Sequence, residues 1–577
     1  MANDNQKEKQ QITGSEALIH SLIAEGVDTI FGYPGGQIMP VFDKLYDFQK
    51  ELRHVLVRHE QGAVHAAQGY ARVSGRTGVV IVTSGPGATN VITGVADAMI
   101  DSTPLVVVTG QVASVQLGTD AFQETDVIGI TLPITKWSYQ IRRPEDVAWA
   151  VARAFYIARS GRPGPVVLDF AKNAQVGMVD YHYEPCKFIR SYCPIPALPN
   201  DKIREAAELI NNAKKPFVIF GQGITLGNAE NELQQFLDKT GIPAAATLLG
   251  LGALPTDYKH NKGMLGMHGN IGPNVKTNEC DVLIAMGMRF DDRVTGNVAT
   301  YAKQAKIIHI DIDAAEIGKL IPVHIGILAD VKQALTALIK LVNPAKHDAW
   351  EAEFDACYKV EKEHVIDVET NPGTGPINMG EVVKCVAEVS KSKAVVVTDV
   401  GQNQMLSARY STFCQPRSLI TSGGLGTMGF GLPAAIGAKI ACPERPVCFF
   451  GGDGGVQMTL QEFGTIMQEH TGVKIVILNN NWLGNVRQWQ ELFFGARYSQ
   501  TRMINPDFMM IAEAYGFSHR QVRERGELRG AVEAMFADND EPFVLEVCVV
   551  EEGMVFPMIP PGKGVTDIML NSKEWYK

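Results

Sequence analysis

Two polar clusters, each placed after an apolar run, could together bind a metal ion. Asp453 lies in the GDGG tetrad that follows the apolar run 447–450, and Asn480 lies in the NNN triplet that follows the apolar run 473–478. If both runs are strands of a parallel sheet, a right-handed crossover can make them neighbours, and their carboxyl ends then meet at one edge. A carboxylate and an amide are oxygen ligands suited to Mg²⁺, which fills its octahedron with water or phosphate.

The glycines around Asp453 favour a diphosphate as the remaining ligand. Gly452, Gly454 and Gly455 have no side chain, so the backbone can approach a phosphate closely. The helix expected over about 457–470 would present free N–H groups and its positive dipole end to the same anion. A GDG triplet alone is usually a turn, and an aspartate before a helix is often an N-cap. The second cluster at a matched strand end makes a metal–diphosphate site the stronger interpretation, and the pair is typical of thiamine-diphosphate enzymes.

An acid near the start of the chain could take part in proton transfer. Glu60, in RHEQGA, lies between a strand expected at 54–58 and a helix expected at 62–73. A thiamine cofactor needs a carboxyl group that shares a proton with its aminopyrimidine ring. Taken alone, Glu60 is more simply a first-turn residue that interacts favourably with a helix dipole. Beside the pair formed by Asp453 and Asn480, the catalytic interpretation is preferred.

Composition limits the class of protein. The chain has 577 residues, 45% of them hydrophobic and 20% charged, which is typical of a globular protein with three or four domains. The net charge of −10 argues against non-specific nucleic-acid binding. Neither a membrane span nor the apolar core of a signal peptide is present in the sequence, so we expect a cytoplasmic protein without a membrane partner. Nine cysteines without a CxxC pair favour reduced, buried thiols.

Strand-like and helix-like segments alternate through three blocks, separated by linkers at 183–200 and 344–377. This rhythm predicts an α/β fold in which helices cover both faces of parallel sheets. The strands expected in the first two blocks are 29–32, 54–58, 78–83, 105–109, 166–169, 217–221, 244–248, 282–286 and 307–311, and the helices named between them are 62–73, 90–100 and 201–212.

Many stretches, from about residue 12 to residue 568, resemble acetohydroxyacid synthase, also called acetolactate synthase, and in particular its large catalytic subunit. They are FGYPGG (31–36), RHEQGA (58–63), TSGPGATN (83–90), DAFQETD (120–126), SGRPGP (160–165), MLGMHG (264–269), RFDDRVTGN (289–297), SGGLGTMGFGLPAAIGA (422–438) and VRQWQ (486–490). The resemblance implies three doubly wound α/β domains with parallel sheets. These are a pyrimidine-binding domain at 12–190, a central FAD-binding domain at 200–343 and a pyrophosphate- and Mg²⁺-binding domain at 378–570.

The same resemblance implies residue roles around thiamine diphosphate. It makes Asp453, Asn480 and the carbonyl of Trp482 the metal ligands. The diphosphate would be lined by Val400, Gly401, Gln402, Asn403, Gly452, Gly454 and Gly455. Gly426 and Met428 would lie beneath the thiazolium ring, although ordinary core packing is the usual role of a methionine. Glu60 would be the catalytic acid at the aminopyrimidine ring. The reacting carbons would be surrounded by Gly36, Phe122, Gln123, Lys172 and Trp489, with a packed interface aromatic as an equal alternative for Trp489.

The central block has weak evidence of its own for a dinucleotide, because FGQG at 220–223 is not a GxGxxG motif. Asp311 and Asp330 end strand-like runs, where an acid can bind ribose or simply cap a turn. The resemblance implies FAD binding by Arg162, Gly221, Gly223, Thr247, Leu248, Met264, His268, Gly269, Arg289, Asp311, Ile312 and Asp330. Since the family's reaction transfers no net electrons, FAD is expected to be structural.

The implied activity is that of a transferase. It decarboxylates pyruvate on thiamine diphosphate and joins the two-carbon unit to pyruvate or 2-ketobutyrate, giving 2-acetolactate or 2-acetohydroxybutyrate for branched-chain amino-acid synthesis. The active unit is expected to be a homodimer or homotetramer, in which Glu60 of one protomer faces the cofactor held by the partner's Asp453. A small regulatory subunit is a further expected partner.

Several residues depart from the family pattern. Ala171-Lys172-Asn173 stands where Pro-Lys-Asp is common, Asn403 replaces a histidine, Asn485 a methionine and Gln37 an alanine. The resemblance therefore does not extend to ketoacid preference or inhibitor sensitivity. Two alternatives stay open: a flavin-coupled pyruvate oxidase or simple decarboxylase on the same fold, which shares GDG, NN and the acid, and a non-enzymatic regulatory or scaffold protein.

Overall fold

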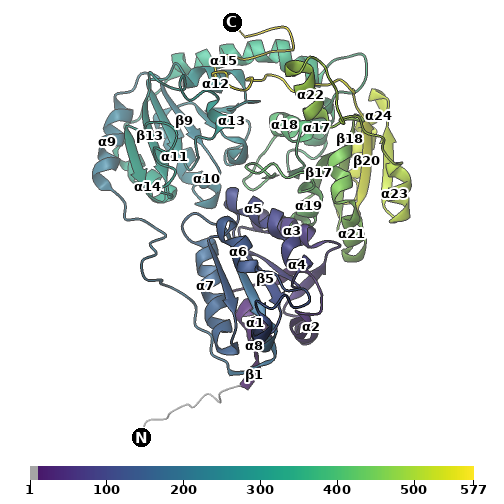
Figure 1. Ribbon diagram of the computed structural model, residues 1–577. Helices are drawn as coiled ribbons and strands as arrows, with labels where there is room; N and C mark the ends of the chain where they lie inside the picture. Colours follow the sequence, from purple (N-terminus) through teal and green to yellow (C-terminus); the bar gives the residue numbers. More distant parts are fainter. Residues whose placement is uncertain (1–10, 577) are drawn as a thin grey trace. The chain divides into compact units, whose positions relative to one another are not determined.

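The computed structural model describes residues 11–576 and contains three parallel sheets of six strands each (Figure 1). Residues 11–193, together with residues 424–443 and 459–471, form one compact unit, and the other described residues form a second. The first unit holds one of the three sheets and the second holds two. This confirms the α/β fold class expected from the sequence.

The sheet of the first unit has the strand order β3-β2-β4-β5-β7-β6. Its strands are β2 (Thr29–Tyr33), β3 (Arg53–Leu56), β4 (Gly78–Val82), β5 (Leu105–Gln111), β6 (Trp137–Ile141) and β7 (Pro165–Ala171). A separate antiparallel pair joins β1 (Gln11–Thr13) to β8 (Met178–Asp180). The helices of this unit are α1 (Gly14–Ala24), α2 (Met39–Leu45), α3 (Glu60–Ser74), α4 (Pro86–Asn90), α5 (Ile92–Ile100), α6 (Val127–Thr131), α7 (Val147–Arg159), α8 (Lys172–Val176), α19 (Gly431–Ala441) and α21 (Phe463–Glu469).

The apolar run of β4 supplies both cores of this unit, because successive side chains of a strand point to opposite faces. Val79 and Ile81 join the cluster that contains residues of α1 and α7. Val80 and Val82 join the cluster that contains residues of α3 and α5. A strand that is buried on both faces needs a continuous apolar run, which is what residues 79–82 provide.

Helix α19 belongs to the first unit because its backbone packs directly on that of α3. An added Cβ at Gly437 would overlap the carbonyl oxygen of Ala66, and one at Gly69 would overlap that of Ala434. The side chain of Arg72 lies over the ring of Phe430, with its guanidinium carbon 5.3 Å from the ring centroid. Glycines on both helices therefore permit an approach that any larger residue would prevent.

We expect Gly437→Ala to destabilise the first unit by ~3 kcal/mol, because the two helices must move apart to admit the methyl group. Thermal unfolding followed by circular dichroism would show the loss as a lower melting temperature. Gly530→Ala is a control at an exposed helical position, where nothing lies within 4 Å of the added Cβ. That control should be neutral or stabilising by up to ~1 kcal/mol. Equal melting of Gly437→Ala and the wild type would contradict the close packing.

The second unit contains two sheets. The central sheet has the order β11-β10-β9-β12-β13-β14, and the C-terminal sheet has the order β16-β15-β17-β18-β20-β19. Their strands are β9 (Pro216–Phe220), β10 (Ala244–Ala246), β11 (Asn261–Met264), β12 (Val282–Met286), β13 (Lys306–Asp311), β14 (Ile325–Leu328), β15 (Val395–Thr398), β16 (Leu419–Ile420), β17 (Val447–Gly452), β18 (Val473–Asn479), β19 (Ser518–Val522) and β20 (Phe543–Cys548).

Helices surround both sheets of the second unit (Figure 1). They are α9 (Asn200–Asn211), α10 (Gly223–Leu226), α11 (Glu230–Thr240), α12 (Ile271–Thr277), α13 (Asp292–Thr295), α14 (Val331–Leu341), α15 (Asp348–Glu361), α16 (Asp367–Thr370), α17 (Met379–Val389), α18 (Gln402–Tyr410), α20 (Asp453–Met458), α22 (Gly484–Phe493), α23 (Phe508–Ala514) and α24 (Arg525–Met535).

Three local expectations were wrong. The helix expected over 457–470 begins at Asp453 and is interrupted at Thr459, so it forms the separate helices α20 and α21. The strand expected at 54–58 ends at Leu56, and the strand expected at 244–248 ends at Ala246. Short segments near strand ends have their boundaries set by tertiary contacts rather than by their own sequence.

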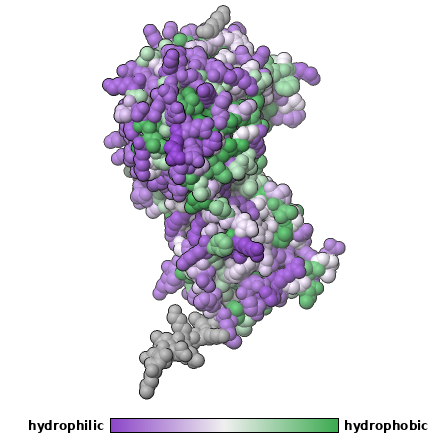
Figure 2. Space-filling view, turned by 90° about the vertical axis from the view of Figure 1, so that its left-hand side faces the viewer, coloured by the Kyte–Doolittle hydropathy of each residue, from purple (hydrophilic) through white to green (hydrophobic). Residues whose placement is uncertain are grey.

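The surface agrees only in part with the expectation for the cysteines. All nine are free, but Cys193 and Cys414 are exposed and Cys186 and Cys548 are half-buried, so only the other five are buried thiols. Figure 2 shows hydrophilic residues interspersed with small hydrophobic areas on the visible faces. Within residues 11–576, none of the helices has the length and hydrophobicity to cross a membrane.

Candidate active site

The two polar clusters lie at the ends of neighbouring strands in the C-terminal sheet. Strands β17 and β18 pair in parallel, with Gly452 opposite Leu478, so Asp453 and Asn480 both follow the same edge of the sheet. Both side chains are buried, at 1% and 3% exposure. The strand order therefore brings together the two residues that the sequence analysis paired.

Asn505 joins these two loops, and the sequence analysis missed it. Its Nδ2 lies 2.6 Å from Oδ2 of Asp453, 3.1 Å from Oδ1 of Asn479 and 3.2 Å from Oδ1 of Asn481. Its Oδ1 accepts a hydrogen bond of 2.9 Å from Nε2 of Gln457. In the sequence Asn505 begins an Asn-Pro-Asp triplet, which indicates only a turn, so no local signal could have identified it.

The electrostatics of the Asp453 loop suit a cation. Burial raises the pKa of Asp453 to about 6, and hydrogen bonds from Asn505 and from the N–H of Gly454 partly oppose this. A buried carboxylate is costly without a positive partner. A divalent cation bound to the other carboxylate oxygen would supply that partner.

The oxygen atoms at this edge fit Mg²⁺, which prefers hard oxygen ligands. Asn480 Oδ1 accepts from the N–H of Trp482 at 3.2 Å and retains a second lone pair. Trp482 pairs with Arg502 in an antiparallel bridge, and the flanking residues make the hydrogen bonds of that bridge. The N–H and C=O of Trp482 therefore point away from Arg502, toward the side of Asn480.

A concave backbone region built from glycines, which we call the cradle, lies beside this edge. Gly401 has φ +115°, which favours glycine, and helix α18 begins directly after it. A Cβ at Gly452 would be 3.5 Å from Nδ2 of Asn403, and one at Gly484 would overlap Oε1 of Gln402. Oδ1 of Asn403 is buried without a hydrogen-bond partner in residues 11–576. A helix N-terminus beside glycines, with an unsatisfied amide, fits a diphosphate and its cation.

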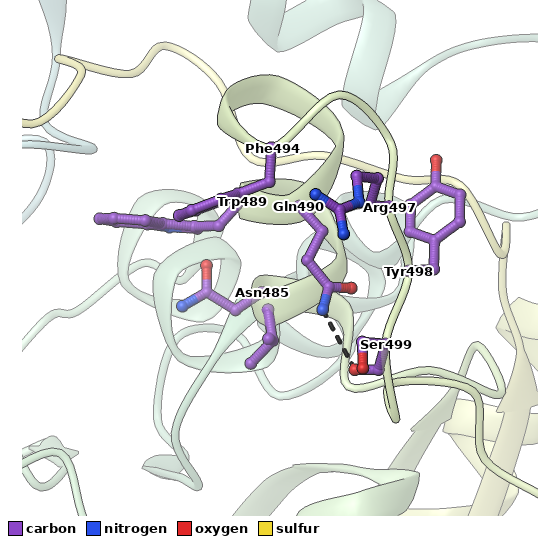
Figure 3. Close-up of a pocket in the computed structure, with 8 residues that line it drawn as sticks. Asn485, Trp489, Gln490, Phe494, Arg497, Tyr498 and Ser499 are labelled. Atoms are coloured by element: carbon purple, nitrogen blue, oxygen red, sulfur yellow. Dashed lines mark hydrogen bonds between the residues drawn. The ribbon is translucent and has the colours of Figure 1, made fainter.

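A cavity of about 740 Å³ opens next to the cradle, on helix α22 and the segment that follows it (Figure 3). The ring of Trp489 lies against that of Phe493, with 5.6 Å between centroids. Asn485 lies between the cavity and the cradle. It lines the cavity, and its Cβ lies 3.9 Å from a Cβ placed on Gly401. The lining combines apolar side chains with two amides, two hydroxyl-bearing residues and one cation, and consists of Asn485, Val486, Trp489, Gln490, Phe494, Arg497, Tyr498 and Ser499.

In the first unit, Glu60 is the first residue of helix α3. Its Oε2 accepts a hydrogen bond of 2.9 Å from Nδ2 of Asn90, and its Oε1 lies 3.5 Å from a Cβ placed on Gly87. The preceding loop is fixed by the buried carboxylate of Glu462, which accepts from the N–H of Arg58 at 3.1 and 3.2 Å. The half-buried Glu60 is thus held at the carboxyl end of β3, next to the TSGPG loop.

Other predicted residues gather at the same end of the first sheet. Nζ of Lys172 donates to the carbonyl of Gly36 at 3.2 Å. Gln123 has φ +62°. Its backbone would lie 3.0 Å from a Cβ placed on Gly85, so only glycine fits at position 85. Phe122 is 84% exposed, which leaves its ring free to contact a ligand or another chain.

A buried acid supports the loop that carries Phe122 and Gln123. Oδ2 of Asp169 accepts from Nε2 of Gln140 at 2.8 Å and from Nε2 of Gln111 at 3.1 Å. The same Nε2 of Gln111 donates to the carbonyl of Thr125 at 2.9 Å. Burial raises the pKa of Asp169 to about 6, although its hydrogen-bond donors oppose the shift.

Asp169→Asn should destabilise the first unit by ~1–3 kcal/mol, because its amide would face the two glutamine donors. The loss should depend on pH. A carboxyl whose folded pKa is raised from 3.8 to about 6 stabilises the fold below the unfolded value and loses that contribution as pH rises through about 6. The melting-temperature gap between wild type and variant should therefore shrink from about pH 4 to about pH 7. A gap that is constant or grows over this range would contradict the raised pKa.

The loop that carries Gly426 and Met428 is anchored to helix α5. Oγ1 of Thr427 donates to Oδ2 of Asp97 at 2.5 Å, and the N–H of Gly424 donates to Oδ1 of Asp101 at 2.8 Å. Gly426 has φ +70°, so the loop turns where glycine is favoured. These residues belong to the first unit, whereas the Asp453 edge belongs to the second.

The residues predicted to bind FAD in the central domain follow the carboxyl ends of its strands. Backbone packing is close there, because a Cβ at Gly221 would lie 2.6 Å from the carbonyl oxygen of Gly287. Burial lowers the pKa of His268 to about 3, and its Nδ1 has no partner among the described residues. Asp330 caps α14 by accepting from the N–H of Gln333, so its capping role is real.

Two further residues fix the loop around His268. Arg409 donates to the carbonyls of His268 and Gly269 at 2.8 and 3.2 Å, and forms a buried ion pair of 2.6 Å with Glu361. An unsatisfied imidazole in a closely packed glycine crevice at the strand ends fits a dinucleotide. Of the predicted FAD residues, Arg162 alone lies in the first unit, where it donates to Oγ of Ser102 at 2.8 Å.

Comparison with known proteins gives three family matches along the chain. Residues 12–130 match "Thiamine pyrophosphate enzyme, N-terminal TPP binding domain", residues 203–338 the "central domain" and residues 399–547 the "C-terminal TPP binding domain" of the same family.

Curated relatives match over nearly the whole chain. One is the acetolactate synthase isozyme 2 large subunit of Escherichia coli K12, with 44% identity over 97% of this chain and 99% of the relative. The acetolactate synthase large subunit of Lactococcus lactis is 44% identical over 96% of each chain. A probable acetolactate synthase large subunit of Methanocaldococcus jannaschii is 43% identical over 96% of this chain and 95% of its own.

Proposed function

The chain belongs to the acetolactate synthase large-subunit family of thiamine pyrophosphate enzymes, and from this premise we propose how its residues carry out the reaction. Its activity is that of a thiamine-diphosphate-dependent acetolactate synthase. We infer functional domains at 12–190, 200–343 and 378–570. The adjacency of the Asp453 and Asn480 loops carries the proposal, since it supplies a cation site beside a phosphate cradle.

Bound thiamine diphosphate supplies an electron sink, so that a 2-ketoacid can lose CO₂ and keep a two-carbon unit for transfer. Asp453, Asn480 and the carbonyl of Trp482 hold Mg²⁺, while residues 400–403 and the glycines at 452, 454 and 455 bind the diphosphate. Gly426 and Met428 support the thiazolium ring. Glu60 holds a proton at N1′ of the aminopyrimidine ring, and does so from the second protomer of a dimer.

The cavity on α22 receives the second 2-ketoacid. Trp489 gives it an apolar wall, and Arg497 offers a charge that suits a carboxylate. One methylene in an apolar slot contributes ~1–3 kcal/mol, which is enough to distinguish 2-ketobutyrate from pyruvate. Gly36, Phe122, Gln123 and Lys172 complete the surroundings of the reacting carbons.

FAD takes a structural place at the strand ends of the central sheet. We infer that FAD contacts Gly221, Gly223, His268 and the other family-matched positions. Its role is structural because the reaction transfers no net electrons. We further propose a homodimer or homotetramer in the cytoplasm. The description of the relatives as large subunits supports a small regulatory subunit as a partner.

The test is an assay of purified protein with pyruvate, thiamine diphosphate, Mg²⁺ and FAD. Acetolactate without oxygen uptake is the expected result. Acetate or acetyl phosphate with oxygen uptake, or free acetaldehyde, would instead indicate the oxidase or decarboxylase. Absence of turnover, even with a regulatory subunit added, would indicate a non-enzymatic role.

The acceptor site is tested in the same assay with pyruvate and 2-ketobutyrate in competition. Trp489→Leu should change the ratio of 2-acetohydroxybutyrate to 2-acetolactate by about 5-fold to 100-fold, which corresponds to ~1–3 kcal/mol. An unchanged ratio would make Trp489 a packing residue, the alternative that its sequence allowed.

A further inference from the structure

A segment downstream of the GDG motif is hydrogen-bonded to the loop that carries Asn480. We call residues 499–507 the strap. The N–H of Leu483 donates to the carbonyl of Thr501, and the N–H of Met503 donates to the carbonyl of Asn481, each at 2.8 Å. These bonds flank the antiparallel bridge between Trp482 and Arg502. Two backbone hydrogen bonds therefore join the strap to the loop that carries Asn480.

Asn505 is the strap residue that reaches into the site. Its neighbour Ile504 is 95% exposed, so apolar burial at that position does not hold the strap in place. The Nδ2 of Asn505 instead faces three acceptors, on Asp453, Asn479 and Asn481. One side chain thus connects the start of α20, which directly follows β17, with the end of β18 and the loop after it.

The orientation of this amide is fixed by a further contact. Nε2 of Gln457 donates to Oδ1 of Asn505 at 2.9 Å and to the carbonyl of Asp453 at 3.0 Å. The donor side of the amide must therefore face the carboxylate of Asp453. Asn505 contacts Oδ2 of that carboxylate, so its hydrogen bond does not compete with a cation at Oδ1.

We propose that Asn505 is a positioning residue for the metal–diphosphate site, holding the Asp453 carboxylate and the Asn480 loop at a fixed separation before the cation binds. The inference rests on the proposed function, because it assumes that this edge binds Mg²⁺. Hydrogen-bond partners of metal ligands orient those ligands, and their loss commonly reduces metal affinity by ~10–100-fold. A cation joining two loops is especially sensitive to their separation, since Mg²⁺ demands near-ideal octahedral geometry.

The experiment compares Asn505→Ala with Ile504→Ala, an exposed neighbour in the same strap. Mg²⁺ is titrated into each protein with excess thiamine diphosphate, and binding is followed by intrinsic fluorescence and calorimetry. The Mg²⁺ concentration at half-saturation should rise by ~10–100-fold for Asn505→Ala and stay within about twofold for Ile504→Ala. Without Mg²⁺ and cofactor, both variants should still unfold in one cooperative transition, so that the lower Mg²⁺ affinity of Asn505→Ala reports on the site and not on an unfolded chain.

Asn505→Leu, which is similar in size but has no donor, provides a second variant if the alanine variant fails to fold. Its Mg²⁺ affinity should fall by the same factor, and its KM for pyruvate at saturating Mg²⁺ should change little. Wild-type Mg²⁺ affinity in either folded variant would overturn the role of Asn505 while leaving the proposed function intact. Failure of the wild-type protein to bind Mg²⁺ and thiamine diphosphate would overturn the proposed function itself.

Discussion

Asp453→Asn is expected to lower turnover by about 10³-fold or more at millimolar Mg²⁺, a loss of at least ~4 kcal/mol. Among the three proposed ligands, Asp453 is the only one with a negative charge. Asparagine keeps the shape and still accepts a hydrogen bond from Asn505, so the loss would reflect charge rather than packing. The measurement is turnover as a function of Mg²⁺ concentration, together with the binding of thiamine diphosphate by calorimetry.

The matched control for this variant is Asp507→Asn in the same unit. Asp507 is exposed and caps α23 by accepting from the N–H groups of Met509 and Met510 at 2.9 and 3.0 Å. Asparagine is an equally good N-cap, so turnover and stability should stay near those of the wild type. Should Asp453→Asn retain the Mg²⁺ dependence and turnover of the wild type, the cation would have to bind elsewhere.

Glu60→Gln should reduce turnover by ~10²–10⁴-fold while leaving cofactor affinity within about threefold. Glutamine can still accept the hydrogen bond from Asn90, so the start of helix α3 should keep its shape. It cannot hold a transferable proton at the cofactor ring, which is the property that catalysis requires. Steady-state kinetics at saturating thiamine diphosphate, with calorimetric affinity measured in parallel, separate the two effects.

Glu184→Gln, an exposed position in the linker, removes the same charge without touching the site and should be neutral. Turnover at the wild-type rate in Glu60→Gln would remove Glu60 from its proposed role. A fall in cofactor affinity equal to the fall in turnover would instead make Glu60 a binding residue.

Local sequence was sufficient to predict that Asp453 and Asn480 follow neighbouring strands at one edge of a sheet. The runs 447–450 and 473–478 are continuously apolar, each ends in polar residues, and the structure makes them the adjacent strands β17 and β18. Burial on both faces demands such runs, and ligand loops of parallel sheets lie at the carboxyl ends. Both requirements act over a few residues, so they can be read from one segment at a time.

The same local reasoning failed where distant segments meet. Edge strand β6 was missed because its residues are only half-buried and lack a continuous apolar run. The strap was missed because Asn505 lies on no periodic segment, and its partners Asp453 and Asn481 become neighbours only after folding. The break between α20 and α21 falls at Thr459, whose Oγ1 donates at 3.1 Å to the carbonyl of Gly429, a residue distant in the sequence.

The sequence by itself determined the α/β class, the cofactor family and the pair of loops that offers oxygen ligands. Those properties depend on residue type, on turn chemistry and on apolar runs, all of which act within a short stretch of chain. Only the tertiary structure decided that Asn505 donates a hydrogen bond to Asp453 and that α19 packs on α3 through Gly437 and Ala66. Such contacts depend on the close approach of segments far apart in the chain, and side-chain identity alone does not encode which distant surfaces will meet.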